Sequence, residues 1–140
     1  NFANEVFITL QAHPFAFDGL NLLLNTIQLI KDEINPKLIT SGVIVTMFDS
    51  RTKLSREIYE KVLNNSNVGS KLFRTSIKQN IKIAEATKFR KSIISYDLEC
   101  SGAKDYLNLC KEICEQTKVL NGQTKKSNHS SQDTPTIDIL

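Results

Sequence analysis

A glycine-rich phosphate-binding loop is missing from this sequence. Its 140 residues include five glycines, and neither G-x-x-x-x-G-K-S/T nor G-x-G-x-x-G occurs among them. Such loops hold the phosphates of a nucleotide through closely approaching backbone N–H groups. Any nucleotide would therefore have to be held at its phosphates by residues outside this chain.

Long apolar runs and an even number of cysteines are also missing. No stretch of about 18 apolar residues could span a membrane, and no charged-then-apolar leader opens the chain. Only Cys100, Cys110 and Cys114 occur, which argues against a disulfide framework and for a reducing compartment. We therefore expect a cytoplasmic protein. Asn1 stands where an initiator Met is usual, so we interpret the chain as a fragment or a processed product.

Positive charge is concentrated in one segment. The composition, 40% hydrophobic and 24% charged, is that of one globular domain, and the net charge is only +3. Between residues 71 and 91, however, Glu85 is the only acid, whereas the basic residues are Lys71, Arg74, Lys78, Lys82, Lys88, Arg90 and Lys91. Composition alone favours a solvated face. Contact with a phosphate backbone, without sequence readout, is the alternative.

The hydrophobic pattern alternates between strands and helices. Residues 5–11 and 41–48 read as strands, and the unbroken Val-Ile-Val of the second indicates burial on both faces. Further strands are predicted at 71–77 and 92–96, and helices at 16–34, 54–63, 81–89 and 102–116. This order predicts an α/β fold with a parallel sheet, flanking helices and right-handed βαβ units. Residues 1–116 form the predicted domain, and 117–140 a disordered polar tail.

No catalytic or metal-binding residue can be assigned. Cys110 and Cys114 are spaced i, i+4 on a predicted helix and could share a metal, but they also fall on its apolar face. Two thiols in the core are the favoured interpretation. His13 follows a strand and could serve as a base, yet no partner nucleophile is identifiable, so a loop histidine is the simpler reading.

Four segments, taken in order, resemble the C-terminal half of the ParA/Soj-type partition ATPases, the deviant-Walker family that includes MinD. The resemblance runs from about Ala3 to Cys114 and is carried by ITLQAHPFAFDGLNLLLNTIQLI, GVIVTMFDSRTKLSREI, SIKQNIKIAEA and ISYDLECSGAKDYLNLCKEI. It implies a partial P-loop NTPase fold that lacks its N-terminal half. The parent protein would bind ATP and Mg²⁺.

The resemblance also implies site residues. The strand containing GVIVTMF would end beside the adenine, with a base pocket formed by Thr46, Met47, Lys78 and Asn80. Non-specific DNA binding is implied for Arg51, Lys53, Arg56 and Lys82. Two departures from the family pattern concern this region, because Lys78 stands where proline is usual and Arg90 replaces the usual glycine.

The missing half would carry the lysine-bearing phosphate loop, the magnesium ligands and the switch acids, so this chain alone should not hydrolyse ATP. The parent is expected to form a face-to-face homodimer, coat nucleoid DNA without sequence preference and respond to a ParB-like partner while it partitions chromosome or plasmid DNA. A membrane role is not expected, because the tail is polar. The alternative is a non-enzymatic remnant or a DNA- or partner-binding module from a degraded partition locus.

Overall fold

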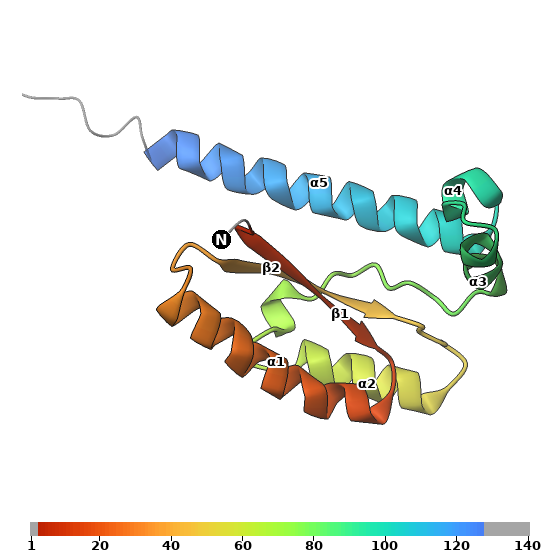
Figure 1. Cartoon of the computed structure of the whole chain (residues 1–140), viewed down its shortest axis with the longest axis horizontal. Coiled ribbons are helices and arrows are strands. Elements are labelled where there is room, and N and C mark those ends of the chain that lie inside the picture. The colour runs from red at the N-terminus through yellow and green to blue at the C-terminus, as the bar shows by residue number, and fades with distance from the viewer. Residues whose placement is uncertain (1–2, 128–140) are drawn as a thin grey trace, which may run out of the picture.

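A parallel pair of strands forms the centre of the molecule. The computed structural model describes residues 3–127, and residues 117–127 are described by their backbone only. In it β1 (Glu5–Gln11) pairs in parallel with β2 (Ile39–Thr46) along its whole length, and α1 (Pro14–Glu33) makes the connection between them (Figure 1). The predicted strand–helix–strand unit is therefore confirmed, although the second strand begins and ends earlier than the predicted 41–48.

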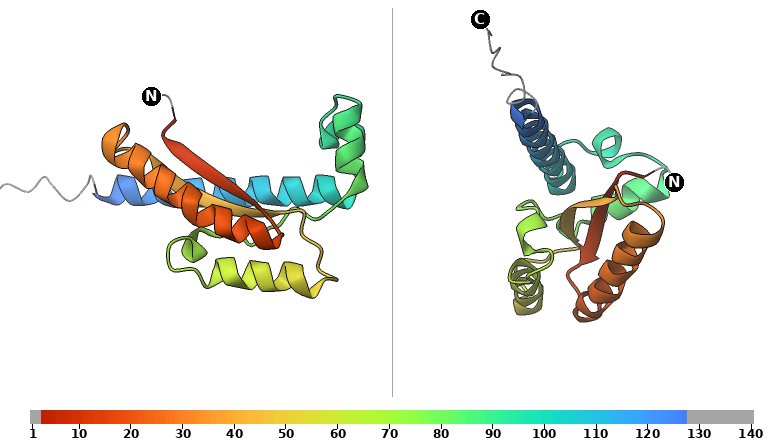
Figure 2. Two further views of the ribbon diagram at one scale, coloured as in Figure 1. Left: turned by 60° about the horizontal axis from the view of Figure 1, so that its bottom comes forward. Right: turned by 90° about the vertical axis from the view of Figure 1, so that its left-hand side faces the viewer.

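Three further helices begin close to their predicted positions: α2 (Lys53–Leu63), α3 (Ile81–Lys88) and α5 (Ser101–Ser127). Side-chain caps define two of these starts, because Thr52 accepts the Ser55 backbone N–H at 3.2 Å and Asn80 accepts that of Lys82 at 2.8 Å. Helices α1 and α2 cover one face of the strands and α5 covers the other (Figures 1 and 2). The result is an α/β fold of three layers.

The third predicted strand, 71–77, is wrong. Gly69–Lys71 is a turn of 3-10 helix (η1), after which the chain runs extended beside β2 without a continuous ladder. It meets β2 at isolated bridges, Val43 with Leu72 and Phe48 with Lys78. Between the bridges, the backbone N–H groups of Arg74 and Thr75 donate to a carboxylate of α5, so they are not available to a strand partner. We call residues 72–80 the edge segment.

The fourth predicted strand, 92–96, is also wrong, because Ile93–Tyr96 forms a turn of helix, α4. The Ser92 hydroxyl accepts the Ser95 backbone N–H at 3.1 Å and so starts this turn. The apolar side chain of Ile93 is buried between α3 and α5 rather than in a sheet. Short apolar runs of this kind do not distinguish a buried strand from a buried helical turn.

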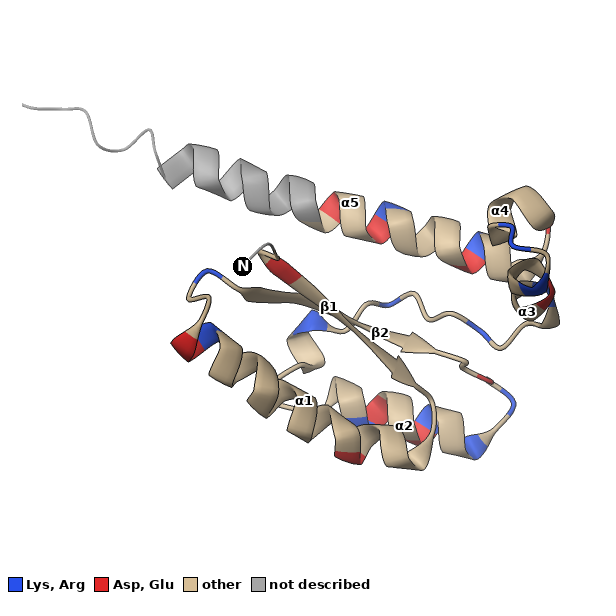
Figure 3. Cartoon of the chain, viewed as in Figure 1, with Lys and Arg blue, Asp and Glu red and all other residues tan. Residues whose placement is uncertain are grey.

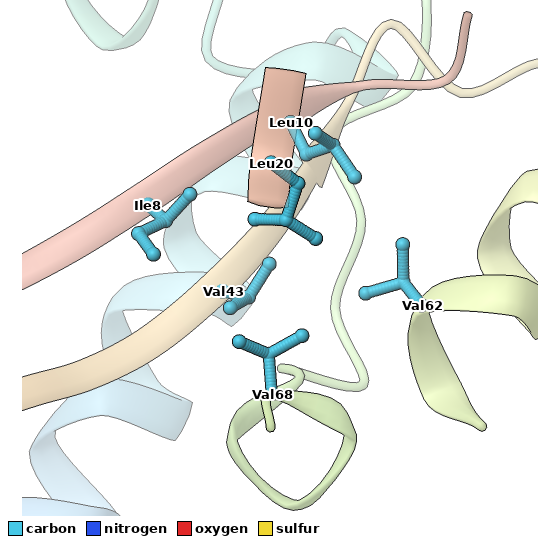
Figure 4. Close-up of a cluster of buried hydrophobic side chains, with 6 residues drawn as sticks. All are labelled: Ile8, Leu10, Leu20, Val43, Val62 and Val68. Atoms are coloured by element: carbon cyan, nitrogen blue, oxygen red, sulfur yellow. The ribbon is translucent and has the colours of Figure 1, made fainter. Parts of the chain in front are cut away.

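Two hydrophobic clusters lie on the two faces of the strand pair. The cluster beneath α1 and α2 contains Ile8, Leu10, Leu20, Val43, Val62 and Val68, which converge from both strands, both helices and the turn before η1 (Figure 4). The cluster beneath α5 contains Ile44, Phe73, Ile77 and Leu109. Val43, Ile44 and Val45 are therefore buried on alternating faces, as the unbroken apolar run predicts.

The face that α5 presents to the sheet differs from the predicted one. Ala103 and Leu109 are buried, but so is Asp105, whereas Cys110 and Cys114 are exposed. The interpretation of these two thiols as core residues is thus wrong. Cys110 and Cys114 lie on the opposite side of α5 from Asp105 and Leu109, which face the strands. Hydrogen bonds to the edge segment determine which side of the helix faces the strands.

Helix α5 also passes its predicted end at residue 116. Its backbone is helical to Ser127, so the first part of the segment predicted as a disordered tail is helical instead. The rest of that predicted tail, 128–140, lies outside the described residues.

Gly42 allows a close contact in the core. A Cβ built at this position of β2 would overlap the ring of Phe73, a side chain that is completely buried. We expect Gly42→Ala to lower the free energy of unfolding by about 1–3 kcal/mol, because the ring must shift within a packed core. Chemical denaturation measures this loss. Gly19→Ala is the matched control: nothing lies within 4 Å of its added methyl group, and an alanine in mid-helix should stabilise by about 0.5–1 kcal/mol. Equal effects of the two substitutions would contradict this packing.

Candidate functional site

The chain is strained where it leaves β2. Met47, the residue after the strand, has φ 51°, a left-handed conformation that is unfavourable for a side chain of this size. Its neighbour holds the turn in place: the Phe48 N–H donates to the Ile77 carbonyl and the Phe48 carbonyl accepts from the Gln79 N–H, both at 3.1 Å. The Met47 side chain remains half exposed, at 51%. Strained residues held by their surroundings in this way are concentrated at ligand sites.

A cleft opens beside this turn. It has a volume of about 490 Å³ and lies between the loop after β2, the edge segment and the starts of α3 and α5. Its lining residues are Phe48, Asp49, Ser50, Arg51, Lys78, Gln79, Ile81 and Ser101. We call it the β2-end cleft. Its size falls within the usual range of small-molecule sites, and it lies at the carboxyl ends of parallel strands, where α/β proteins bind ligands.

The structure places the predicted base-pocket residues at or near this cleft, but not all line it. Lys78 lines it. Asn80 lies at its α3 side, where its amide donates to the Ser101 hydroxyl at 2.8 Å. Thr46 ends β2, and its hydroxyl is directed at the Leu10 carbonyl at 3.4 Å. Thr46 and Met47 therefore border the site through the end of the strand rather than through the cleft wall.

A larger groove, of about 580 Å³, lies at the opposite end of the strands, between the start of β2, η1 and α5. None of the residues that the resemblance assigns to the base pocket or to the DNA surface lines it, although Lys71 and Arg74 of the basic segment do. We place the candidate site at the β2-end cleft, because backbone strain, strand ends and predicted residues coincide there.

Two acidic side chains of α5, which the sequence analysis missed, hold the edge segment. The buried Asp105 accepts the Lys78 backbone N–H at 3.0 Å, and the Lys78 ammonium lies 3.5 Å from its other oxygen. Glu112 accepts the N–H groups of Arg74 and Thr75 at 2.8 and 3.0 Å. The signal available in the sequence was their spacing, i and i+7, which puts both on one face of a helix. Of these, the bonds of Asp105 to Lys78 fix the wall of the β2-end cleft.

The ionisation of Glu112 is tied to this contact. Burial alone would raise the pKa of its carboxyl, but hydrogen bonds from the Arg74 backbone and from Thr75, with the nearby Arg74 guanidinium, outweigh burial and lower the pKa below its ordinary 4.5. The charged carboxylate is thus the form that the fold prefers. Its stabilising effect is present above that ordinary pKa and is lost as the pH falls through the lowered value.

Three of the four cations predicted to contact DNA form ion pairs with acids, and Arg56 forms none with the side chains that the structure describes. The Arg51 side chain makes two hydrogen bonds to Asp49, Nε to Oδ1 at 3.0 Å and Nη2 to Oδ2 at 2.9 Å. The bond from the Arg51 side chain lowers the pKa of Asp49 to about 2, and the Asp49 bond raises that of Arg51. Lys53 lies 3.5 Å from Glu57 in the next turn of α2. Arg56 is exposed on the same helix.

Lys82 belongs to a small network on α3. Its ammonium is 3.3 Å from Glu85, whose carboxylate also accepts a hydrogen bond from the Tyr96 hydroxyl at 3.0 Å. The hydrogen bond to Glu85 is the main reason that the pKa of Lys82 is raised. Lys82 and Arg51 come from different parts of the chain, but the start of α3, which carries Lys82, and the loop that carries Arg51 border the same β2-end cleft. The loop after β2 and α3 both lie at the end of the molecule to which the strands point (Figure 3). An exposed ion pair with a single contact, such as Lys82 with Glu85, is weak and can exchange partners.

Neither a membrane-crossing helix nor a metal cluster occurs in the described part of the chain. Within residues 3–127 no helix is both long and apolar enough to cross a membrane, and no group of three or more His, Cys, Asp or Glu side chains comes together as a metal site.

Glu112→Gln should destabilise the protein in a pH-dependent way. Above about pH 5 we expect a loss of about 1–2 kcal/mol in the free energy of unfolding, because an amide replaces a charged acceptor of two backbone N–H groups. Below the lowered pKa of Glu112 the wild type loses this advantage, so the two proteins should converge. Urea denaturation between pH 3 and 6 measures the difference. Glu115→Gln, exposed on the same helix, is the control. A difference that is constant across this range would contradict the role of the charge.

Comparison with known proteins identifies relatives of this chain. It is 43% identical over 111 residues to the chromosome-partitioning ATPase Soj of Treponema pallidum, a match that covers 79% of this chain and 43% of the relative. It is 35% identical over 116 residues to the chromosome partitioning protein ParA of Caulobacter vibrioides, covering 83% and 43%. The sporulation initiation inhibitor protein Soj of Bacillus subtilis is 37% identical over 111 residues, with coverage of 79% and 43%. No family model matches the chain.

The fold has a counterpart among solved structures. The cobyrinic acid a,c-diamide synthase of Mycobacterium smegmatis, solved with bound ADP and magnesium, superposes with a TM-score of 0.56 at 20% identity, over 98% of this chain and 43% of that protein. This likeness shows a partial P-loop-like α/β fold. The sequence matches show more: the chain is homologous to the ParA and Soj partition ATPases over about 80% of its length, and spans less than half of theirs.

Proposed function

We propose that this chain is the C-terminal portion of an ATPase that partitions chromosome or plasmid DNA by ATP-dependent dimerisation and non-specific DNA binding. The observation that carries the proposal is the alignment with Soj and ParA proteins at 35–43% identity, which spans about four fifths of the chain. The parent protein is proposed to act on the nucleoid in the cytoplasm, as a homodimer, with a ParB-like partner.

The nucleotide base is proposed to lie at the β2-end cleft. Thr46 and Met47 would contact it from the strand end, and Lys78 and Asn80 from the edge segment and the start of α3. The strained turn at Met47 and the anchoring of Lys78 by Asp105 support this, because both hold the cleft in one geometry before a ligand arrives.

The described residues suit a base but not the triphosphate or Mg²⁺. The sequence has no phosphate loop, and no carboxylate cluster for a metal occurs in the described part of the chain. The phosphates and the metal would have to be held by the part of the parent protein that this sequence does not contain. We assign no catalytic step to the residues of this chain.

The DNA surface is proposed to comprise Arg51, Lys53, Arg56 and Lys82. Arg51 and Lys82 are paired with Asp49 and Glu85, and a DNA phosphate would take the place of the carboxylate in each pair. The exchange is open to a phosphate, because 88% of the Arg51 side chain and 48% of the Lys82 side chain are exposed in these pairs. It also provides no sequence readout, which suits binding to bulk DNA.

The uncovered parts of the fold are where the rest of the parent protein is proposed to pack. In the described chain β1 pairs only with β2, so its other edge is open. Large apolar side chains are exposed on β1 and α5, among them Phe7 at 40%, Tyr106 at 42% and Leu107 at 40%. Open edges and apolar patches of this kind are usually covered in a complete protein.

A non-enzymatic DNA- or partner-binding module is the second candidate. The exposed cations Arg51, Lys53, Arg56 and Lys82 would serve it as well, because all four lie in the described part of this chain. The coding sequence upstream of Asn1 separates the two: an in-frame, lysine-bearing phosphate loop supports the ATPase, whereas a start codon near Asn1 supports the module.

Arg51→Ala and Lys82→Ala should each weaken binding of the full-length protein to unrelated duplex DNA sequences by about the same factor for every sequence. The slope of log affinity against log salt should flatten by roughly 0.9 for each phosphate that the variant no longer neutralises. Salt titration by fluorescence anisotropy on random-sequence duplexes, with ATP present, measures both quantities.

Lys37→Ala is the matched control, because Lys37 is exposed in the turn between α1 and β2, at the other end of the strands. If the Arg51 and Lys82 variants bind DNA as the control does, their charges form only a solvated face and the proposed DNA surface is wrong.

A further inference from the structure

Helix α3 ends in a turn that places an arginine where a glycine is usual. The Lys91 N–H donates to the Ala86 carbonyl and the Arg90 N–H to the Thr87 carbonyl, both at 3.0 Å. This pair of bonds is the Schellman motif, in which the residue after the helix cap adopts the left-handed conformation. Arg90 occupies that position with φ 54°. Glycine would adopt it without strain, so the arginine is kept at a conformational cost.

The cations of this turn form no ion pairs with the described acidic side chains, unlike most cations of the proposed DNA surface. Lys88, Arg90 and Lys91 are all exposed, and none takes part in an ion pair with the side chains described between residues 3 and 116. Arg51, Lys53 and Lys82, by contrast, each have a carboxylate within 4 Å. The charge of the turn is therefore uncompensated. We call residues 88–91 the basic turn.

The dipole of α3 explains only part of the positive charge of the basic turn. Cations near the last turn of a helix are stabilised by its dipole. Lys88 and Lys91 could supply that effect from ordinary backbone conformations, with glycine at position 90. The dipole does not account for a third cation at the one residue where a side chain is disfavoured.

We propose that the basic turn binds phosphates of the DNA backbone and extends the DNA surface to the far end of α3. The inference rests on the proposed function and adds a site to it. Lys82 lies in the first turn of α3 and Arg90 just past its last, about 12 Å along the helix axis at a rise of 1.5 Å per residue. Each DNA strand carries one phosphate for every 3.4 Å of duplex axis, so roughly three to four phosphates of a strand lie within that length of the axis. Both ends of α3 can thus reach phosphates of one duplex.

The position of the turn agrees with this assignment. Helices α3 and α4 lie at the end of the molecule to which the strands point, the end that also carries the loop after β2 (Figures 2 and 3). Between the cations, the exposed Phe89 ring is stacked on Tyr96, with centroids 5.7 Å apart, so the turn is supported from within. Its cations are therefore presented on a supported surface rather than on a loose loop.

Arg90→Gly separates a binding role from a structural one, because it removes the cation and relieves the backbone at once. We expect the melting temperature to rise by about 3 °C. Affinity for random-sequence duplex DNA should nevertheless fall by roughly five- to tenfold at about 0.1 M salt, and the salt slope should flatten by about 0.9, as expected when one phosphate is no longer neutralised. Arg90→Lys keeps the charge and should retain most of the affinity. Lys91→Ala, which leaves the left-handed residue in place, should also weaken binding.

The outcomes distinguish this inference from the proposed function. If Arg51→Ala and Lys82→Ala weaken binding to the labelled duplex while Arg90→Gly and Lys91→Ala do not, the basic turn is not a DNA site, although the proposed function survives. If none of the four weakens binding, both fail. Phosphatidylcholine vesicles with and without phosphatidylglycerol test the other anionic surface. Binding to the anionic vesicles that Arg90→Gly abolishes, with DNA binding unchanged, would assign the turn to lipid and overturn the proposal.

Discussion

The hydrogen bonds from the edge segment to Asp105 and Glu112 are the interaction on which the rest of this structure depends. The edge segment has no continuous ladder with β2, so its backbone needs other partners, and the two carboxylates supply them. Buried backbone N–H groups without partners are costly, and charged acceptors are the strongest partners that a side chain offers. The two carboxylates also determine which side of α5 faces the strands, because Asp105 and Glu112 must both point toward the edge segment.

The position of the β2-end cleft follows from that anchoring. Asp105 holds Lys78, Lys78 pairs with Phe48 across the isolated bridge, and Phe48 holds the strained turn at Met47. A change at Asp105 would thus reach the end of β2 through two backbone contacts. The same end of the molecule carries paired cations, Arg51 and Lys82, and the unpaired basic turn. Ligands of opposite charge to these cations are therefore favoured at this end, whatever their exact identity.

The parts of this fold that the sequence could predict are those that depend on local patterns. The unit from β1 through α1 to β2 was predictable because long apolar strands and a 3.6-residue period leave few alternatives. The third strand was mispredicted because its N–H groups are taken by Glu112, which lies far along the chain. Periodicity contains no information about such a partner. The turn at α4 was too short to be distinguished from a strand.

The candidate site was predictable only in part, and chiefly through resemblance to a family. Lys78 and Asn80 lie at the cleft, but no local pattern indicated that Met47 and Arg90 would be left-handed. Asp105 and Glu112 were overlooked because an acidic residue on a helix usually faces solvent. Cys110 and Cys114 were placed in the core because they fall on the apolar face of the predicted helix, but this face is exposed at both positions. Burial of an acid requires a tertiary partner, which one sequence does not reveal.

Photolabelling of the full-length protein with 8-azido-ATP tests the central claim, that an adenine base lies at the β2-end cleft, most directly. The azide reacts with residues beside the base, and mass spectrometry of the peptides locates the label. We expect label on the peptide that contains Met47 or on residues 78–80, reduced by excess ATP. The account would be contradicted if the label were found only outside residues 46–80 and were also reduced by excess ATP.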